Sequence, residues 1–273
     1  MNKIYQIYQV SDSTGETLDR IFLAIKAQFT NFNCKTIHYS FTRTKNQIDK
    51  IIFKSKTEKN VIILYTIVDN KLAQYMEDVA KKNNIPCFEV LGSLISDFSK
   101  LLKQQANRIP SGQHALDKEY YKRIEAVQFT ITHDDGKIIK DLNNSDVVLV
   151  GISRTSKTPT SIYLANRGYK VANIPLILNK SIPAQLMESS KKTCIVGLVC
   201  DVTRLSDVRR NRIQSMNEDR AVDYTNEKKI LNELENSKKL FKEYNWPVID
   251  VTRKSVEETA ASIIKILDIL NSK

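Results

Sequence analysis

The sequence predicts an α/β protein in which mainly parallel sheets are flanked by helices. First, short apolar runs alternate along the chain with longer amphipathic segments, the order that builds a parallel sheet. Second, the 273 residues are 41% hydrophobic and 27% charged, which is typical of a globular protein with one large or two modest domains. Third, polar loops that contain glycine follow two of the apolar runs, as expected where strands end beside a ligand.

The first half of the chain alternates between apolar runs of strand length and segments with helical spacing. Short runs rich in Ile, Val and Tyr predict strands at Ile4–Val10, Lys35–Phe41, Val61–Val68 and Pro86–Val90. Segments with apolar residues three and four positions apart predict helices at Thr17–Gln28, Asn46–Ile52, Lys71–Lys82 and Ser93–Gln105.

The alternation breaks in the middle of the chain, where proline and glycine flank a charged helical piece at Tyr120–Val127. Residues 109–145 are therefore expected to bridge an N-terminal α/β domain, residues 1–108, and a C-terminal domain, residues 146–273.

The second half returns to the same alternation, and no internal repeat is visible in the sequence. Apolar runs predict strands at Asp146–Val150, Lys170–Ile174, Cys194–Cys200 and Val248–Val251. Helical spacing predicts helices at Pro159–Arg167, Arg204–Met216, Glu227–Tyr244 and Val256–Leu270.

The most informative motif lies between the strand that ends at Val150 and the helix that follows it. The residues in order are Gly151, Ile152, Ser153, Arg154, Thr155, Ser156, Lys157 and Thr158. They match the phosphate-loop pattern G-x-x-x-x-G-K-[ST], except that serine replaces the second glycine. Backbone N–H groups of such a turn bind phosphate oxygens, the lysine adds a charge, and the threonine hydroxyl binds Mg²⁺. The loop is thus predicted to bind a nucleotide.

Ser156 is the weak point of the motif. If this position requires a positive φ, a residue other than glycine is strained there. An ordinary strand-to-helix turn is the alternative, but the strand, loop and helix context favours a phosphate loop.

A second polar loop follows the first predicted strand, at Ser11, Asp12, Ser13, Thr14 and Gly15. These residue types cap helices, and the same hydroxyls at the end of a strand also suit an anion. Both interpretations stay open.

Charged residues near the ends of other elements supply further candidates. Asp201 closes the run at Ile195–Val199, where an acidic residue orients Mg²⁺ in phosphate-loop proteins, although a turn or helix cap explains it nearly as well. Arg209 and Arg212 are three residues apart on one helix face and suit a phosphate, although a solvated helix is a fair alternative.

The bridge contains His114 and His133, which could serve proton transfer or hold a substrate group, and Asp135; His114 and Asp135 are kept as candidates. A turn at Asp134, Asp135 and Gly136 together with surface histidines is the alternative interpretation.

The composition excludes several classes of protein. The net charge of +11 favours anionic partners, but the lysines are scattered, so no nucleic-acid partner is expected. The four cysteines lack the spacing of a zinc site, and no signal peptide or membrane span is predicted. We expect a cytoplasmic protein without a membrane partner, and leave a homodimer open.

Several segments together resemble the regulatory proteins of pyruvate, phosphate dikinase and of phosphoenolpyruvate synthase. The resemblance rests on the loop at 11–17, on 120–126, on Asp134-Asp135-Gly136, on the block 151–176, on Val251-Thr252 and on 255–260. In this family serine or glycine precedes the phosphate-loop lysine. The context around Gln113 and His114 resembles the dikinase branch, and the synthase branch stays the alternative.

The resemblance implies a bifunctional enzyme that phosphorylates a threonine of pyruvate, phosphate dikinase with ADP as donor. It also implies removal of that phosphate by inorganic phosphate, with release of pyrophosphate. In this chain Lys157 would stabilise the transferred group, Thr158 and Asp201 would serve Mg²⁺, and Asp135 would be a base. The chemistry of phosphoryl transfer adds Arg154 and Arg209 as cations that neutralise charge. The loop at 11–15 would hold the phosphothreonine or the incoming phosphate.

Two other classes of function fit the same residues. A phosphate-loop kinase of a small metabolite would need no protein acceptor. A nucleotide-sensing binding module would bind nucleotide without transferring a phosphoryl group.

Overall fold

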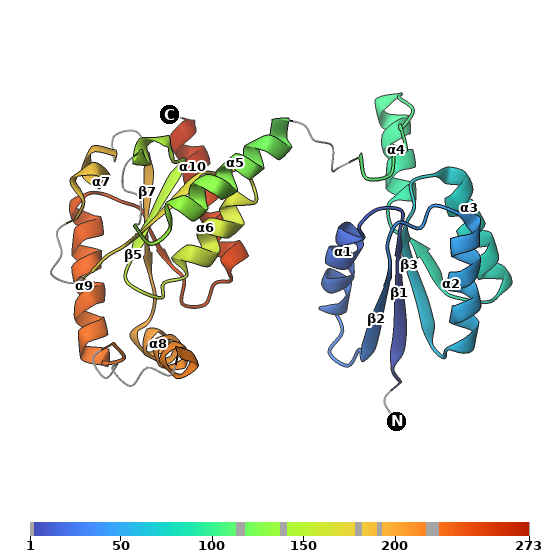
Figure 1. Cartoon of the computed structure of the whole chain (residues 1–273), viewed down its shortest axis with the longest axis horizontal. Helices are drawn as coiled ribbons and strands as arrows, with labels where there is room; N and C mark the ends of the chain where they lie inside the picture. The colour runs from blue at the N-terminus through green and yellow to red at the C-terminus, as the bar shows by residue number, and fades with distance from the viewer. Residues whose placement is uncertain are drawn as a thin grey trace. The chain divides into compact units, whose positions relative to one another are not determined.

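The computed structural model describes residues 3–112, 118–136, 141–177, 182–189, 193–216 and 224–272. The chain divides into two compact units, unit 1 (Met1–Ala115) and unit 2 (Leu116–Lys273). Each contains a parallel sheet flanked by helices, so the predicted fold class is confirmed (Figure 1). None of the described helices is long and apolar enough to cross a bilayer. All four cysteines are unpaired.

Unit 1 is built from four parallel strands and the helices between them. The strands are β1 (Tyr5–Ser11), β2 (Cys34–Tyr39), β3 (Val61–Thr66) and β4 (Cys87–Glu89). The helices are α1 (Glu16–Lys26), α2 (Lys45–Thr57), α3 (Asn70–Lys82) and α4 (Gly92–Leu102). The sheet order is β2-β1-β3-β4. The strand order therefore reverses between β1 and β3.

Alternating side chains of these strands form two cores. Ile7 packs with Leu18 and Phe22 of α1 on one face. Tyr8 faces the other side, where it packs with Ile48 of α2 and with residues of α3. Figure 1 shows α1 on one side of the sheet and α2 and α3 on the other.

Unit 2 contains a second sheet of four parallel strands. The strands are β5 (Val147–Gly151), β6 (Val171–Pro175), β7 (Cys194–Val199) and β8 (Val248–Asp250). The helices are α5 (Lys118–Thr132), α6 (Lys157–Ala165), α7 (Ala184–Ser189), α8 (Val202–Met216), α9 (Glu227–Glu243) and α10 (Val256–Asn271), with 3₁₀ turns η2 (Asp134–Gly136) and η3 (Leu142–Asn144). The sheet order is β6-β5-β7-β8, the same order as in unit 1.

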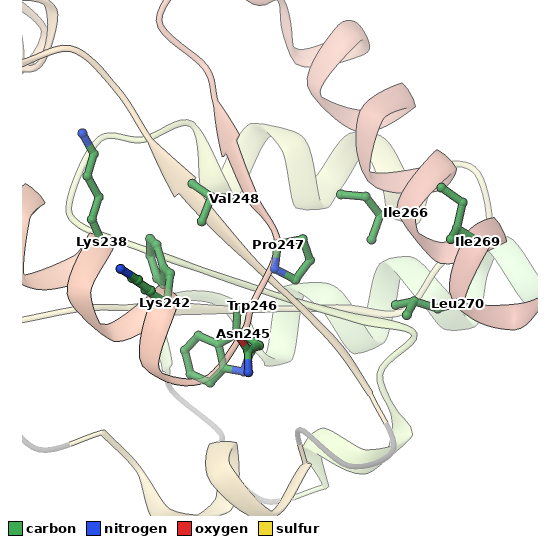
Figure 2. Close-up of a pocket in the computed structure, with 10 residues that line it drawn as sticks. Lys238, Lys242, Asn245, Trp246, Pro247, Val248, Ile266, Ile269 and Leu270 are labelled. Atoms are coloured by element: carbon green, nitrogen blue, oxygen red, sulfur yellow. The ribbon is translucent and has the colours of Figure 1, made fainter. Parts of the chain in front are cut away.

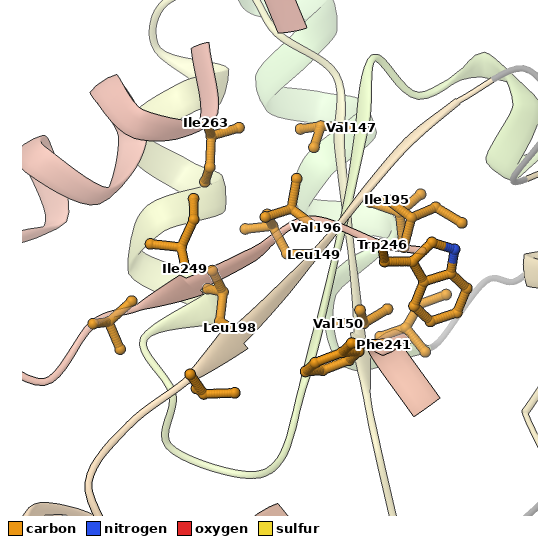
Figure 3. Close-up of a cluster of buried hydrophobic side chains, with 14 of the residues drawn as sticks. Val147, Leu149, Val150, Ile195, Val196, Leu198, Phe241, Trp246, Ile249 and Ile263 are labelled. Carbon is orange, nitrogen blue, oxygen red and sulfur yellow. The ribbon is translucent and has the colours of Figure 1, made fainter. Parts of the chain in front are cut away.

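The core of unit 2 surrounds β5, which is buried along its whole length. Val147, Leu149 and Val150 lie among side chains of β7 and of the flanking helices (Figure 3). Helices α5, α6 and α10 cover one face and α9 covers the other (Figure 1). Burial on both faces explains why the strands read as continuous apolar runs.

Several boundaries differ from those expected from the sequence. The stretch 109–145 is divided between the two units, because α5 packs on α6 and β6 of unit 2. Helix α5 is longer than the predicted helix at 120–127, and α7 was not predicted. Helix α6 begins at Lys157 and not at Pro159, since proline is tolerated anywhere in the first turn of a helix, where the N–H group has no intrahelical partner.

Candidate functional site

The loop after β5 lies at the point where the strand order of unit 2 reverses, the usual ligand position in an open parallel sheet. Gly151 begins it. A Cβ atom there would lie 2.6 Å from the Leu198 carbonyl oxygen and 2.8 Å from the Thr155 Oγ1 atom. The close approach of β5 to β7 therefore requires glycine at this position.

The backbone of the loop turns twice through the left-handed region. Arg154 has φ 71° and Ser156 has φ 60°. Thr155 between them is fully buried, and its hydroxyl donates to the Ile152 carbonyl at 3.0 Å. Such turns direct successive N–H groups toward one point and form an anion-binding concavity. Ser156 thus has the left-handed conformation for which the phosphate-loop pattern normally uses glycine.

Lys157 is buried inside this loop. Its Nζ atom donates to the Ile152 carbonyl at 2.9 Å. Burial lowers the pKa of Lys157 to about 8, and the nearby carboxylates of Asp135 and Asp134 counteract that effect. A bound phosphate would place a negative charge beside this ammonium group and so stabilise its protonated form.

Three polar side chains meet at the start of α6. The Thr158 hydroxyl donates to Asp134 Oδ1 at 3.1 Å. Asn173 Nδ2 donates to the same oxygen at 2.6 Å and to Thr158 Oγ1 at 3.0 Å. The Asn173 Oδ1 atom is buried and has no hydrogen-bond partner within the described part of the chain.

This donor set fits Mg²⁺. The ion prefers oxygen ligands and is usually held by one or two carboxylates together with substrate phosphates. Thr158 and Asp134 supply a hydroxyl and a carboxylate oxygen, and Asn173 has an unsatisfied amide oxygen beside them. Sequence reasoning missed Asp134 and Asn173 as site residues. The two adjacent aspartates were visible, but nothing in the sequence distinguished which one faces the loop.

The loop opens onto a cavity of about 320 Å³. This volume lies within the range of roughly 300–1,000 Å³ for small-molecule sites. The lining combines loop residues with groups from η2, β6 and α8: Asp135, Ser153, Arg154, Ser156, Lys157, Thr158, Pro159, Pro175 and Val208. Asp135 and Arg154 are thus brought to the cavity together with Lys157.

Arg209 does not line this cavity and instead contacts the backbone of the loop. Its side chain is fully buried, forms an ion pair of 2.7 Å with Glu233 and donates to the Ser153 carbonyl at 3.2 Å. The guanidinium lies 4.6 Å from the ring centroid of Tyr224, whose hydroxyl is 2.7 Å from the Ser153 hydroxyl. The predicted direct contact of Arg209 with phosphate is therefore replaced by a positioning role.

Asp201 is not part of this site either. Its Oδ1 atom accepts from the backbone N–H groups of Thr203 and Arg204, at 2.9 and 3.2 Å. It caps the N-terminus of α8, which was the alternative interpretation. The carboxylate that approaches Thr158 is that of Asp134, from η2.

Unit 1 has a separate cavity of about 140 Å³ at its own strand reversal, at the ends of β1 and β3. Ser11, Asp12, Ser13 and Gly15 line it. Whether this loop binds an anion or only caps α1 stays open. Thr14 lies in the same loop and its carbonyl accepts from Ser40. Burial raises the pKa of Asp12, although the Val68 amide donates to its Oδ2 atom at 2.7 Å.

Of the two histidine candidates, only His133 lies within the described residues, and His114 lies outside them. His133 is buried and stacked on Phe129, with ring centroids 3.8 Å apart, which indicates a structural role.

Unit 2 also has a larger cavity of about 580 Å³ at the start of β8. Because the strands are parallel, it lies at their amino ends, whereas the phosphate loop lies at their carboxyl ends. Pro247, Val248, Ile266 and Ile269 give it a mainly apolar lining (Figure 2). Lys238, Lys242 and Asn245 form the polar part of its lining.

Comparison with known proteins shows the family of the chain. The family described as kinase/pyrophosphorylase matches residues 7–264. A protein of Pelagibacter ubique that carries the name pyruvate, phosphate dikinase regulatory protein is 58% identical over 98% of both chains. Relatives of the same name from Bartonella tribocorum and a Chelativorans species are 44% and 42% identical, over 97% and 96% of this chain and 96% of each relative.

Among solved structures, a GTP-binding protein from Sulfolobus solfataricus in complex with GDP aligns with 97% of this chain and 99% of its own, at 14% identity and a TM-score of 0.23. That score is too low to support any argument. The family match covers residues 7–264, nearly the whole chain, and the relative from Pelagibacter ubique is 58% identical. The chain therefore belongs to the kinase/pyrophosphorylase family.

Proposed function

We propose that unit 2 transfers the terminal phosphoryl group of ADP to a threonine of pyruvate, phosphate dikinase. In the second reaction, inorganic phosphate removes that group and pyrophosphate is released. The observation that supports this proposal best is the meeting of the Lys157 ammonium, the Thr158 hydroxyl and the Asp134 carboxylate at one phosphate loop. The names of the relatives support pyruvate, phosphate dikinase as the protein substrate.

In the forward reaction the threonine oxygen forms a bond to the β-phosphorus of ADP. The bond from that phosphorus to the bridging oxygen breaks, and AMP leaves. Lys157 and the loop amides would stabilise the charge on the transferred group, with Arg154 at the exposed side of the cavity. Asp135, which lines the same cavity, is the proposed acceptor of the hydroxyl proton.

In the second reaction an oxygen of inorganic phosphate forms a bond to the phosphorus of phosphothreonine. The bond to the threonine oxygen breaks, the threonine hydroxyl regains a proton, and the product is pyrophosphate. Thr158 and Asp134 would hold Mg²⁺, which neutralises phosphate charge when bound.

The test is transfer of label from ADP carrying radioactive phosphorus in its β-position to purified dikinase. Lys157→Ala is expected to lower the rate roughly a hundredfold or more, because one stabilising contact in the transition state is worth about 3 kcal/mol. Lys170→Ala is the matched control, since Lys170 pairs with Glu125 away from the cavity. Phosphoenolpyruvate synthase is assayed in parallel as the alternative acceptor.

Two results would refute the proposal. One is a folded Lys157→Ala variant with the wild-type transfer rate. The other is label that reaches only a small molecule, or no acceptor at all, in the presence of dikinase.

A further inference from the structure

The cavity of about 580 Å³ at the start of β8 is an open, mainly apolar groove, here called the β8 groove. Phe241 and Trp246 contribute buried side chains to its lining. Val248, Ile269 and Leu270 also line it and are 46%, 52% and 49% exposed. Apolar residues gathered and left open to water in this way mark interaction sites.

The β8 groove is remote from the phosphate loop. It lies at the amino ends of the parallel strands, whereas the phosphate loop lies at their carboxyl ends. The five residues of β5 span about 16 Å between these ends, at roughly 3.3 Å per residue. A group held in the groove therefore cannot contact the phosphate that is transferred, and its effect would be on binding.

One side of the groove carries two lysines. Lys238 and Lys242 are four residues apart on α9, so they lie one above the other on one helix face. Figure 2 shows them on one side of the groove and Ile266, Ile269 and Leu270 of α10 on the other. The described residues that line the groove include no carboxylate.

The charges of these lysines are not compensated by close partners. Both are exposed, and neither forms an ion pair among the described residues. Lys238 acts only at a distance on Asp250, whose carboxylate is held mainly by Thr252. The helix dipole accounts for a cation at Lys242, in the last turn of α9, but not for Lys238 one turn earlier.

Three kinds of occupant could cover the groove, and its charge and exposure favour one of them. A second copy of this chain has the same net charge of +11, which opposes its approach to the lysines. A small molecule would stay partly in water, whereas small-molecule sites bury roughly 70–90% of their ligand. A protein segment with both acidic and apolar side chains complements the lysines and the lining together.

We propose that the β8 groove docks an acidic segment of the protein substrate, with apolar side chains of that segment inserted between α9 and α10. This inference rests on the proposed function, because it takes the substrate of unit 2 to be a protein. Docking at a second site raises the effective concentration of the substrate threonine at the phosphate loop.

Charge reversal tests the role of the two lysines. When Lys238→Glu is combined with Lys242→Glu, the KM for dikinase is expected to rise about fivefold or more, as for the loss of two exposed charge pairs. Because the groove is remote from the reacting groups, kcat and the KM for ADP should stay close to their wild-type values. The rise should shrink at a salt concentration of about 0.5 M, since salt screens exposed charges.

The matched control combines Lys228→Glu with Lys239→Glu. Both residues are exposed on α9 outside the groove, and the change in charge is the same. The KM for dikinase should stay close to wild type in this control. Lys238→Arg combined with Lys242→Arg keeps both charges and should also keep the wild-type KM.

A photo-crosslinking side chain at position 248 identifies the occupant. Val248 is exposed at the start of the edge strand β8, so a benzophenone group placed there replaces no buried side chain. With the full chain and purified dikinase, we expect a crosslink to an acidic segment of dikinase, located by mass spectrometry. The crosslink should persist in Lys157→Ala and be lost when Lys238→Glu and Lys242→Glu are combined.

The inference is overturned if the KM for dikinase rises equally in the groove variant and in the matched control. A crosslink to a second copy of the chain, or to a dikinase segment without carboxylates, would overturn it too. Transfer to dikinase without any crosslink would reject the docking site and leave the proposed function intact. A crosslink to dikinase without transfer of label would do the reverse.

Discussion

Ser156 adopts a conformation that side chains disfavour, at the residue that caps α6. A residue other than glycine in the left-handed region costs roughly 1–2 kcal/mol. Glycine would remove that strain, but it loses about 0.5–1 kcal/mol more conformational entropy on folding. The balance favours glycine slightly.

Ser156→Gly is therefore expected to stabilise unit 2 by up to about 1 kcal/mol in urea unfolding. Ser161→Gly is the matched control within α6, where φ is helical and the Ser161 hydroxyl donates to the Thr158 carbonyl. It should destabilise unit 2 by about 1 kcal/mol. Equal losses for the two variants would show that Ser156 is not strained.

Asp134 and Asp201 are distinguished by what their carboxylates contact. Asp134→Asn removes the charge beside Thr158, so the transfer rate should fall roughly a hundredfold and the Mg²⁺ requirement should rise. Asp201→Asn keeps a good capping residue for α8 and should leave rate and stability close to wild type. Transfer rates measured across a Mg²⁺ titration compare them. A large loss in Asp201→Asn alone would return the metal role to Asp201.

At the scale of elements, α8 and α9 hold the phosphate loop in place through the ion pair of the buried Arg209 with Glu233. Arg209 of α8 connects Glu233 of α9 to the Ser153 carbonyl. Removing one partner of a fully buried pair costs about 3–5 kcal/mol, and the lower end applies here because the remaining Glu233 side chain is 23% exposed.

Arg209→Met is expected to destabilise unit 2 by about 3 kcal/mol and to raise the KM for ADP, since Ser153 loses its support. Arg210→Met is the control on the same helix, because Arg210 is exposed and lies 3.5 Å from Asp207. That exposed pair should contribute less than about 1 kcal/mol. Urea unfolding and steady-state kinetics measure the two effects. Unchanged kinetics in a destabilised Arg209→Met variant would limit the ion pair to stability alone.

At the scale of the whole molecule, each unit has its own hydrophobic core. Ile63 of β3 and Leu149 of β5 are both fully buried, one in each core. Truncating either to alanine should cost roughly 2–5 kcal/mol.

Because the two cores are separate, each substitution is expected to destabilise only the unit that contains it. In hydrogen exchange, Ile63→Ala should lower protection in the sheet of unit 1, and Leu149→Ala should do so in the sheet of unit 2. Equal loss of protection in both sheets from either substitution would indicate a single cooperative structure.

The fold class and the position of the phosphate loop were predictable from the sequence because their signals are local. Apolar runs of strand length, helical spacing and the residues from Gly151 to Thr158 are contiguous in the chain. The family resemblance rested on such contiguous blocks and is confirmed by the match to nearly the whole chain.

Only the tertiary structure decided which distant side chains meet. Asp134 precedes the phosphate loop in the chain, Asn173 follows it, and η2 and β6 bring both to Thr158. The shared strand order of the two units likewise appears only in the sheets. The physical reason is that sequence patterns determine the type of each element, whereas strand pairing and side-chain packing determine which ends of those elements lie together.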